Sequence, residues 1–214
     1  METNARIVIT DEHTQIILGS LLGDGGLEPP PKGSVNWGLS FKHGLAQQEY
    51  ALRKAHLLGA LVRKVDYPDE RIRVRTARHP FLSQWASEVI VEGRRSIPPR
   101  LLSEISPLGL AVWYMDDGSL QTTANKNGTF WRLVRIATCC FTIPEVDALC
   151  TMLKERFDVL GLRKMSKNPR DAQHPYPNIH INGVDAEKFL QIVRPHMVNM
   201  GMDYKKGSSD MGME

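Results

Sequence analysis

Two aspartates are the residues of this sequence best placed to do chemistry, because each follows an apolar run and precedes a glycine. Asp24 ends the run ILGSLLGDG at residues 17–25, and Asp117 ends the run LAVWYMDDG at residues 110–118. Both runs have helical character, so each acid falls at the negative end of a helix dipole. That position disfavours a carboxylate by roughly 0.3–1 kcal/mol. The occurrence of this arrangement twice predicts that a cation binds beside the two carboxylates.

Start and stop signals place both runs on helices. Thr10 precedes the first run, and Ser106-Pro107 precedes the second, with proline suited to the first helical position. Gly25 and Gly118 follow the acids, and we expect both to adopt the left-handed conformation that ends a helix.

Apolar residues on nearly all sides predict that these two helices are buried, most simply against each other. Gly19, Ser20 and Gly23 on the first helix are small enough for two helix backbones to approach closely. Such a contact brings Asp24 and Asp117 to one end of a shared seam.

The order of the other expected elements occurs twice, which indicates a tandem duplication with pseudo-two-fold symmetry. Period-two alternation, turn signals and helix caps predict the following elements: a strand at 35–41, a helix at 46–61, a strand at 71–75, a helix at 81–91, a turn at 125–128, a strand at 131–140, a helix at 143–157, a strand at 176–182 and a helix at 186–193.

The paired runs resemble the motifs of LAGLIDADG homing endonucleases in their single-chain, two-motif form. Residues 110–120, 141–146 and 195–205 follow the order found in an intron-encoded member, so the resemblance covers about residues 12–206. It implies an α+β fold of two pseudo-symmetric, αββαββα-like halves with saddle-shaped antiparallel sheets. The N-terminal half is expected at 1–99, the C-terminal half at 100–206 and a disordered tail at 207–214.

The resemblance implies site-specific, metal-dependent hydrolysis of both strands of DNA, with Asp24 and Asp117 as the catalytic metal ligands. Mg²⁺ (or Mn²⁺) is the expected cofactor, because Mg²⁺ prefers oxygen ligands and can activate water and neutralise charge. Backbone carbonyls near Gly23 and Asp116 could complete the shell of metal ligands. Adjacent helical side chains point about 100° apart, so the Asp116 carboxylate is the less suitable ligand.

Basic residues near the metals assist catalysis in this family, and Lys205 matches one such position. Arg95 matches the other, where the similar family member has lysine. A guanidinium can balance charge but cannot accept a proton, which puts the role of Arg95 in doubt. Lys42 is the alternative in the first half, and a phosphate contact is an equally good interpretation of it.

Alternation in the segment Arg71–Arg75 predicts a strand that buries Ile72 and Val74 and directs three guanidinium groups to the opposite face. Such a face could lie in a DNA major groove or could simply be solvated. Together with the family resemblance, it gives these candidate DNA-binding residues: Lys32, Trp37, Ser40, Lys42, Arg71, Arg73, Arg75, Arg132, Arg135, Thr138, Lys164, Lys167, Arg170 and His180.

Composition agrees with an intracellular globular protein. The 214 residues are 42% hydrophobic and carry a net charge of +3, which is modest for a nucleic-acid binder. The sequence lacks both a long apolar stretch and a basic-then-apolar leader, so we expect a location in the cytoplasm or nucleoid of a prokaryote or in an organelle matrix. The three cysteines have no metal-ligand spacing and are expected to be buried free thiols.

The sequence therefore favours a monomeric endonuclease for a long target site, encoded in an intron or intein-like mobile element. An RNA maturase that assists splicing of its own intron, with or without DNA cleavage, is an alternative. A DNA-binding regulator without catalysis is a further one, although a pure binder has no need of Asp24 and Asp117 at helix ends.

Overall fold

The computed structural model describes residues 7–125, 130–168 and 171–207, and they form two halves built on the same plan. The first half begins with a central helix and contains these elements: α1 (Asp11–Leu22), β1 (Gly25–Glu28), β2 (Gly38–Gly44), α2 (Gln48–Leu58), β3 (Val62–Asp66), β4 (Arg71–Thr76), α3 (Pro80–Val89), β5 (Ile90–Val91), β6 (Arg94–Arg95) and α4 (Pro99–Ser103).

The second half repeats this order after α4. Its elements are α5 (Pro107–Asp117), β7 (Gly118–Ala124), β8 (Phe130–Ala137), α6 (Ile143–Phe157), β9 (Gly161–Asn168), β10 (Asp171–Asn182) and α7 (Gly183–Val193). Short 3₁₀ turns flank α2 and follow α7, the last of them at Asp203–Lys205. The predicted duplication is confirmed.

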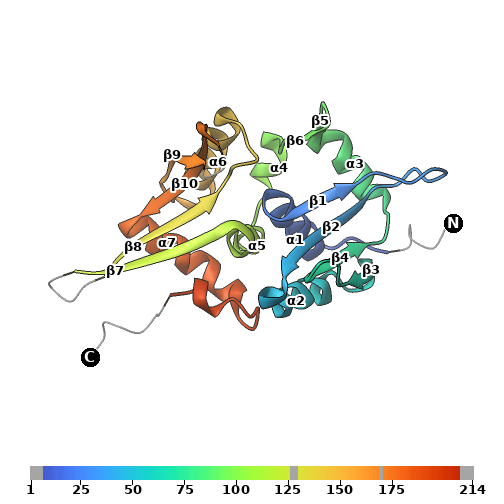
Figure 1. The fold of residues 1–214 in the computed structure, drawn as a ribbon, viewed down its shortest axis with the longest axis horizontal. Coiled ribbons are helices and arrows are strands. Elements are labelled where there is room, and N and C mark those ends of the chain that lie inside the picture. The colour runs from blue at the N-terminus through green and yellow to red at the C-terminus, as the bar shows by residue number, and fades with distance from the viewer. Residues whose placement is uncertain (1–6, 126–129, 169–170, 208–214) are drawn as a thin grey trace.

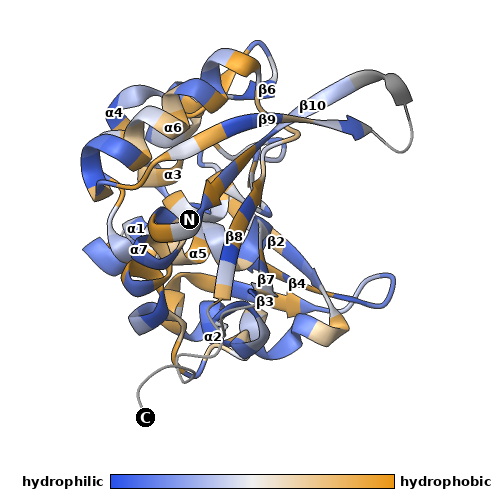
Figure 2. Cartoon of the chain, turned by 90° about the vertical axis from the view of Figure 1, so that its left-hand side faces the viewer, coloured by the Kyte–Doolittle hydropathy of each residue, from blue (hydrophilic) through white to orange (hydrophobic). Residues whose placement is uncertain are grey.

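Each half contains one four-stranded antiparallel sheet, with strand order β1-β2-β4-β3 in the first and β7-β8-β10-β9 in the second. The two sheets lie side by side on one face of the molecule, with α1 and α5 between and beneath them (Figure 1). Figure 2 shows the helices gathered on one side of the sheets and the β9–β10 hairpin projecting on the other. One face of each sheet is therefore packed on helices and the other is open.

Close contact between α1 and α5 joins the halves. Residues 16–22 of α1 and 109–116 of α5 are buried. A methyl group added at Gly19 would lie 2.4 Å from the Gly109 carbonyl oxygen, and one added at Gly23 would lie 2.4 Å from Cβ of Asp116. The expected close approach of two backbones at these small residues is confirmed.

The glycines after the two acids serve a different purpose from the one predicted. Neither Gly25 nor Gly118 has a positive φ, and each instead begins a strand, β1 or β7. A Cβ at Gly118 would lie 2.0 Å from the ring of Tyr114, and one at Gly25 would lie 2.7 Å from the Ser20 carbonyl oxygen. Glycine is needed at both positions because neighbouring atoms leave no room for a Cβ, and not because the backbone has a positive φ.

The predicted helix starts agree with the structure better than the predicted helix ends do. The side chains of Thr10 and Ser106 cap α1 and α5, and Thr142 with Glu145 forms a capping box at α6, whose bounds match the prediction. The expected helix at 46–61 is shorter, because Gly59 has a φ of 48° and ends α2 at Leu58. The strand expected at 35–41 is found at Gly38–Gly44.

Some expectations fall elsewhere or outside the described residues. Cys139 and Cys140 are exposed and Cys150 is half-buried, contrary to the expectation of buried thiols, because β8 ends at Ala137 and the first two lie in the turn after it. Most of the expected turn at 125–128, Arg170 and nearly all of the tail lie outside the described residues. Within the described ranges, no helix combines the length and apolar character that crossing a bilayer requires.

Candidate active site and nucleic-acid interface

The ends of the two central helices place Asp24 and Asp117 in corresponding positions. Asp24 lies in the turn between α1 and β1, and its side chain is 39% exposed. Asp117 is the last residue of α5, directly before β7, and is half-buried. Both acids therefore lie where a central helix passes into the first strand of its sheet, next to the seam between the halves (Figure 1).

Lys205 neutralises the end of α5, which has no basic residue in its own last turn. Its buried Nζ donates to the carbonyl oxygens of Met115, at 2.6 Å, and Tyr114, at 3.5 Å. The Tyr114 hydroxyl in turn donates to the Lys205 carbonyl oxygen at 2.8 Å. A cation at this position offsets the negative end of the helix dipole beside Asp117.

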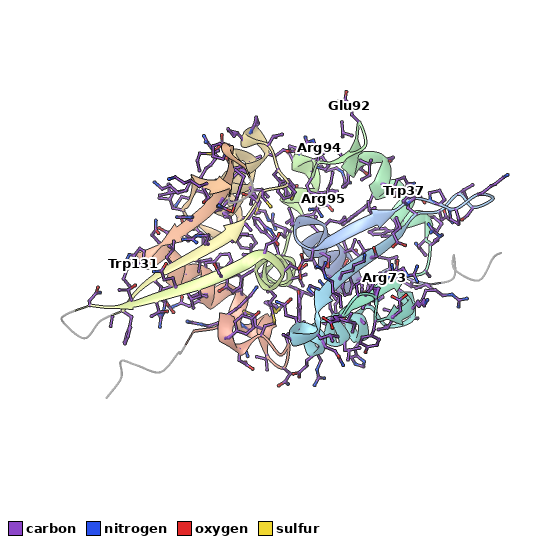
Figure 3. The ribbon with its side chains drawn as sticks, in the orientation of Figure 1. Trp37, Arg73, Glu92, Arg94, Arg95 and Trp131 are labelled. Carbon is purple, nitrogen blue, oxygen red and sulfur yellow. The ribbon has the colours of Figure 1, made fainter. Side chains whose placement is uncertain are left out.

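Arg95 does the same at the end of α1. Its guanidinium donates to the Gly23 carbonyl oxygen at 3.1 Å and to that of Gly25, and it reaches the Cys140 sulfur at 3.1 Å in the other half. Figure 3 shows Arg95 at the centre of the molecule, between the halves. Arg95 and Lys205 thus occupy equivalent positions, and the Gly23 carbonyl already has a hydrogen-bond donor.

A buried ionic cluster surrounds Asp116, and sequence reasoning missed Lys54 and Tyr50 in it. Lys54 Nζ lies 2.9 Å from Oδ1 and 3.1 Å from Oδ2 of Asp116. The Tyr50 hydroxyl donates to Oδ1 at 2.6 Å, and the Asp24 amide donates to Oδ2 at 3.2 Å. Because both carboxylate oxygens already accept hydrogen bonds, Asp116 serves better as a structural anchor than as a metal ligand.

One sequence signal could have identified Lys54. The buried face of α2 consists of Tyr50, Ala51, Lys54, Ala55 and Leu58, a regular helical stripe with one lysine in it. A lysine on such a stripe needs a buried partner, since an unpaired buried charge is strongly unfavourable.

His43 lies between one carboxylate of each half, Asp24 of the first and Asp116 of the second. It is 3% exposed, and its Nδ1 lies 3.3 Å from Oδ2 of Asp24 while Nε2 lies 3.8 Å from Oδ1 of Asp116. Its ring packs edge-on against Tyr50. Within the described residues neither ring nitrogen has a hydrogen-bond partner of good geometry. Sequence reasoning also missed His43, although it continues the alternation of buried residues along β2 that Leu39 and Phe41 begin.

Burial and the neighbouring charged groups change the pKa values of Asp117 and Lys205. Burial raises the pKa of Asp117 to about 7, and the nearby charges of Asp24 and Asp116 add to this effect, while Arg95 and Lys205 oppose it. Burial also lowers the pKa of Lys205. Ligand atoms of Asp24, His43 and Asp116 lie within 4.8 Å of one another. Asp24 and Asp117 offer carboxylate oxygens, the ligands that a hard divalent cation prefers.

The open face of the first sheet carries the predicted basic residues. In β4, Ile72 and Val74 are buried while Arg71, Arg73 and Arg75 face outward, so the period-two pattern is confirmed. Strand register places Ser40 opposite Arg75 and the exposed Lys42 opposite Arg73. Lys32 is exposed in the long β1–β2 connection.

The open face of the second sheet carries a smaller basic group. Arg135 Nε donates to His180 Nε2 at 3.2 Å across β8 and β10. Burial, together with Arg135 and Lys164, lowers the pKa of His180, which keeps its ring neutral and able to accept. Lys164 is exposed on β9 in register with Asn178 on this face, whereas alternation puts the exposed Lys167 on the other face of the same strand.

Three of the proposed DNA contacts are placed differently. Arg132 lies on the helix side of the second sheet, paired with Glu187 of α7. Thr138 is fully buried and donates to the Pro177 carbonyl oxygen at 2.8 Å. Trp37 is half-buried and packs against the core, near one end of the molecule, whereas the exposed Trp131 lies near the opposite end (Figure 3).

Comparison with known proteins identifies the group of sequences to which this chain is similar. Residues 14–189 match the profile of the LAGLIDADG DNA endonuclease family. The chain is 30% identical over 203 residues to a protein named RecA of Mycolicibacterium fallax, covering 90% of this chain and 46% of that protein. The chain spans about half the length of the first curated relatives it matches.

Two further relatives match over more of their own length. The chain is 24% identical to a cytochrome b mRNA maturase of Debaryomyces hansenii, covering 92% of this chain and 74% of the relative. It is 22% identical to the DNA endonuclease I-ChuI of Chlamydomonas applanata, covering 95% and 98%.

Solved structures share the fold. The homing endonuclease I-WcaI bound to its DNA recognition sequence aligns with a TM-score of 0.75 at 21% identity, covering 94% of this chain and 88% of that chain. I-DmoI in complex with DNA and Mn aligns with a TM-score of 0.53 at 16% identity, covering 86% and 96%. The fold expected from the sequence is confirmed.

Proposed function

Since this chain belongs to the LAGLIDADG DNA endonuclease family, we propose that it cuts both strands of double-stranded DNA at a long, specific site. The observation that carries this proposal is the equivalent placement of Asp24 and Asp117, each at the end of a central helix and next to an open sheet. Two carboxylates, one from each half, match two scissile phosphates, one on each of the antiparallel strands. One chain therefore supplies both half-sites, and a monomer suffices.

Asp24 and Asp117 would hold the divalent metal, Mg²⁺ or Mn²⁺. A bound metal of this kind supplies an activated water and neutralises charge on the phosphate. Asp116 would not share in this, because Lys54 and Tyr50 already bind its carboxylate. Its contribution is to fix the Asp24 backbone amide and so the turn that presents the first ligand.

Lys205 and Arg95 would balance charge beside these ligands. Lys205, with a lowered pKa, serves the half-site of Asp117, and Arg95 serves that of Asp24. Because both already donate to helix-end carbonyls, each fixes the backbone before the acid it accompanies. Lys42 is exposed on the open sheet face and is better placed for a phosphate contact than for proton transfer.

The two open sheet faces would bind the DNA. The residues retained from the sequence prediction are those on these faces or their loops: Lys32, Ser40, Lys42, Arg71, Arg73, Arg75, Arg135, Lys164 and His180. Lys167 is also retained, because it is exposed near the end of β9, although it points to the other face of that strand. Phosphate contacts give affinity and position, whereas contacts to base edges give sequence preference.

An RNA maturase is the second candidate, favoured by the similarity to the cytochrome b mRNA maturase over 92% of this chain. A basic sheet face can bind the phosphates of either nucleic acid. RNA binding alone does not explain why an acid stands at the end of each central helix.

A cleavage and binding experiment separates the two candidates. Purified protein is incubated with Mg²⁺ and a plasmid carrying the uninterrupted form of the sequence that surrounds its coding region. We expect one double-strand break, abolished by chelation of the metal. Tight binding to the transcript of the surrounding element without any metal-dependent break would instead establish the maturase.

A further inference from the structure

An acid stands among the basic residues of the open face of the first sheet. Asp66, at the end of β3, binds Arg73 through two hydrogen bonds, Nε to Oδ1 at 2.9 Å and Nη2 to Oδ2 at 2.8 Å. Its Oδ2 also lies 3.0 Å from Nη2 of Arg75 and 3.2 Å from Nζ of Lys64. One carboxylate therefore holds three cations on the surface proposed to face DNA. Figure 3 shows Arg73 on this half of the molecule.

Strand register builds this arrangement. Asp66 is directly opposite Arg73 across β3 and β4, and Lys64 is opposite Arg75. On the other side of β4, Lys42 of β2 is opposite Arg73. Lys42, Arg73 and Asp66 thus form one row across the sheet, so the contact is fixed by backbone pairing as well as by side-chain attraction.

An acid at this position reduces the attraction of the sheet for phosphates. A patch used only for non-specific attraction gains nothing from it, since affinity of that kind grows with the number of neutralised phosphates. The pair of Asp66 and Arg73 is only half-buried, and ion pairs near the surface contribute little to folding stability. A role in orienting Arg73 explains the presence of Asp66 better than non-specific attraction of DNA or folding stability does.

The donors that Asp66 leaves free have a specific geometry. Arg73 uses the side of its guanidinium, Nε and one hydrogen of Nη2, on the carboxylate. The end of the group, with one hydrogen on each terminal nitrogen, is then turned away from Asp66. That pair of parallel donors matches O6 and N7 of guanine in the major groove.

We propose that Asp66 is a positioning residue that holds Arg73 ready to read a guanine in the target. This inference depends on the proposed DNA-binding function and assigns one base-reading residue within it. Asp66 acts through Arg73 and does not itself contact the base. Because the arginine is already fixed, less side-chain freedom is lost on binding a guanine. A different base does not offer the O6 and N7 acceptor pair, so at least one of the two aligned donors is left without an acceptor.

The test compares Asp66→Asn and Asp66→Ala with Asp69→Asn. Asp69 is exposed in the β3–β4 turn, where its φ of 50° also suits asparagine. Its substitution therefore removes the same charge nearby and leaves the hydrogen bonds between Asp66 and Arg73 in place. A target selected by the wild-type protein from a randomised duplex library, its single-base-pair variants and a random duplex are used as probes. Binding is measured in Ca²⁺ at several salt concentrations, and thermal melting confirms that each variant is folded.

We expect both Asp66 variants to lose discrimination by about tenfold at one guanine position, with equal or tighter binding to the random duplex. Arg73→Ala should lose discrimination at the same position, and Asp66→Asn should add nothing to that loss. Asp69→Asn should discriminate like the wild type. Full discrimination by both Asp66 variants at every position would overturn the positioning role alone. Failure of the wild type to prefer any duplex would overturn the proposed function, and this inference with it.

Discussion

The ammonium group of Lys54 lies 2.9 Å and 3.1 Å from the two carboxylate oxygens of Asp116, and neither side chain is exposed to solvent. The pair joins α2 of the first half to α5 of the second. Removal of one partner leaves a buried charge without its counter-ion, so we expect Lys54→Met to reduce the free energy of unfolding by roughly 3–5 kcal/mol. Urea denaturation measures this.

A double variant separates the pair from its surroundings. Lys54→Met combined with Asp116→Leu should recover much of the stability lost by Lys54→Met alone, because no unpaired charge remains. If the two single losses simply add in the double variant, the pair is not coupled and this account of the cluster is wrong.

Close packing at Gly19 should be intolerant of any side chain. A methyl group there would lie 2.4 Å from the Gly109 carbonyl oxygen and 2.7 Å from Cβ of Val112, and the first of these is backbone. We expect Gly19→Ala to cost about 1–3 kcal/mol or more. Gly44→Ala is the matched control, since a Cβ at Gly44 meets nothing within 4 Å and should leave the melting temperature unchanged.

Loss of the cations at the helix ends should have a smaller effect on stability. Arg95→Met and Lys205→Met each remove the hydrogen bonds to the terminal carbonyls of a central helix. We expect a loss of about 0.3–2 kcal/mol in each case, the range for charge–dipole interactions at helix ends. Thermal denaturation checks this, and a loss well beyond that range would mean that packing of the long side chains dominates.

The raised pKa of Asp117 predicts a pH dependence for the metal-free protein. Its pKa is about 7 in the folded state against an ordinary value of 3.8, so the folded state retains the proton that the unfolded state releases. The contribution of this group to stability is complete below the lower value and is lost as pH rises from about 4 to about 7. Over this range, the free energy of unfolding should fall by up to about 1.4 kcal/mol per pH unit because of this group.

Asp117→Asn provides the comparison for this pH effect. In the presence of a chelator, the variant should lack the part of the wild-type slope that this carboxyl contributes. Addition of Mg²⁺ at pH 7.5 should raise the melting temperature of the wild type more than that of the variant. Identical slopes for the two proteins would show that burial of Asp117 is not the cause.

The sequence was sufficient for the features that depend on local pattern. Alternation at Ile72 and Val74, caps at Thr10 and Ser106 and small residues at Gly19 and Gly23 each determine local geometry, and each was found as expected. The position of the boundary between the halves, near residue 99, stays a prediction.

Partners that lie on a different element could not be read from pattern. The role of Lys54 depends on Asp116, which is far from it in sequence. The contact of Asp66 with Arg73 depends on the register of β3 against β4. The same reason explains Arg132, which was expected to bind DNA and instead pairs with Glu187 on the helix side. Side chains whose environment is created by another element become assignable only when that element is placed.

The central claim is that Asp24 and Asp117 each serve one of two half-sites for metal-dependent DNA cleavage. The most direct measurement follows each strand of a duplex target, separately end-labelled, with wild type, Asp24→Asn and Asp117→Asn in Mg²⁺. The wild type should cut both strands, and neither variant should produce a double-strand break, although both should bind the target within a few fold of wild-type affinity. Cleavage of both strands at the wild-type rate by either variant would contradict the account.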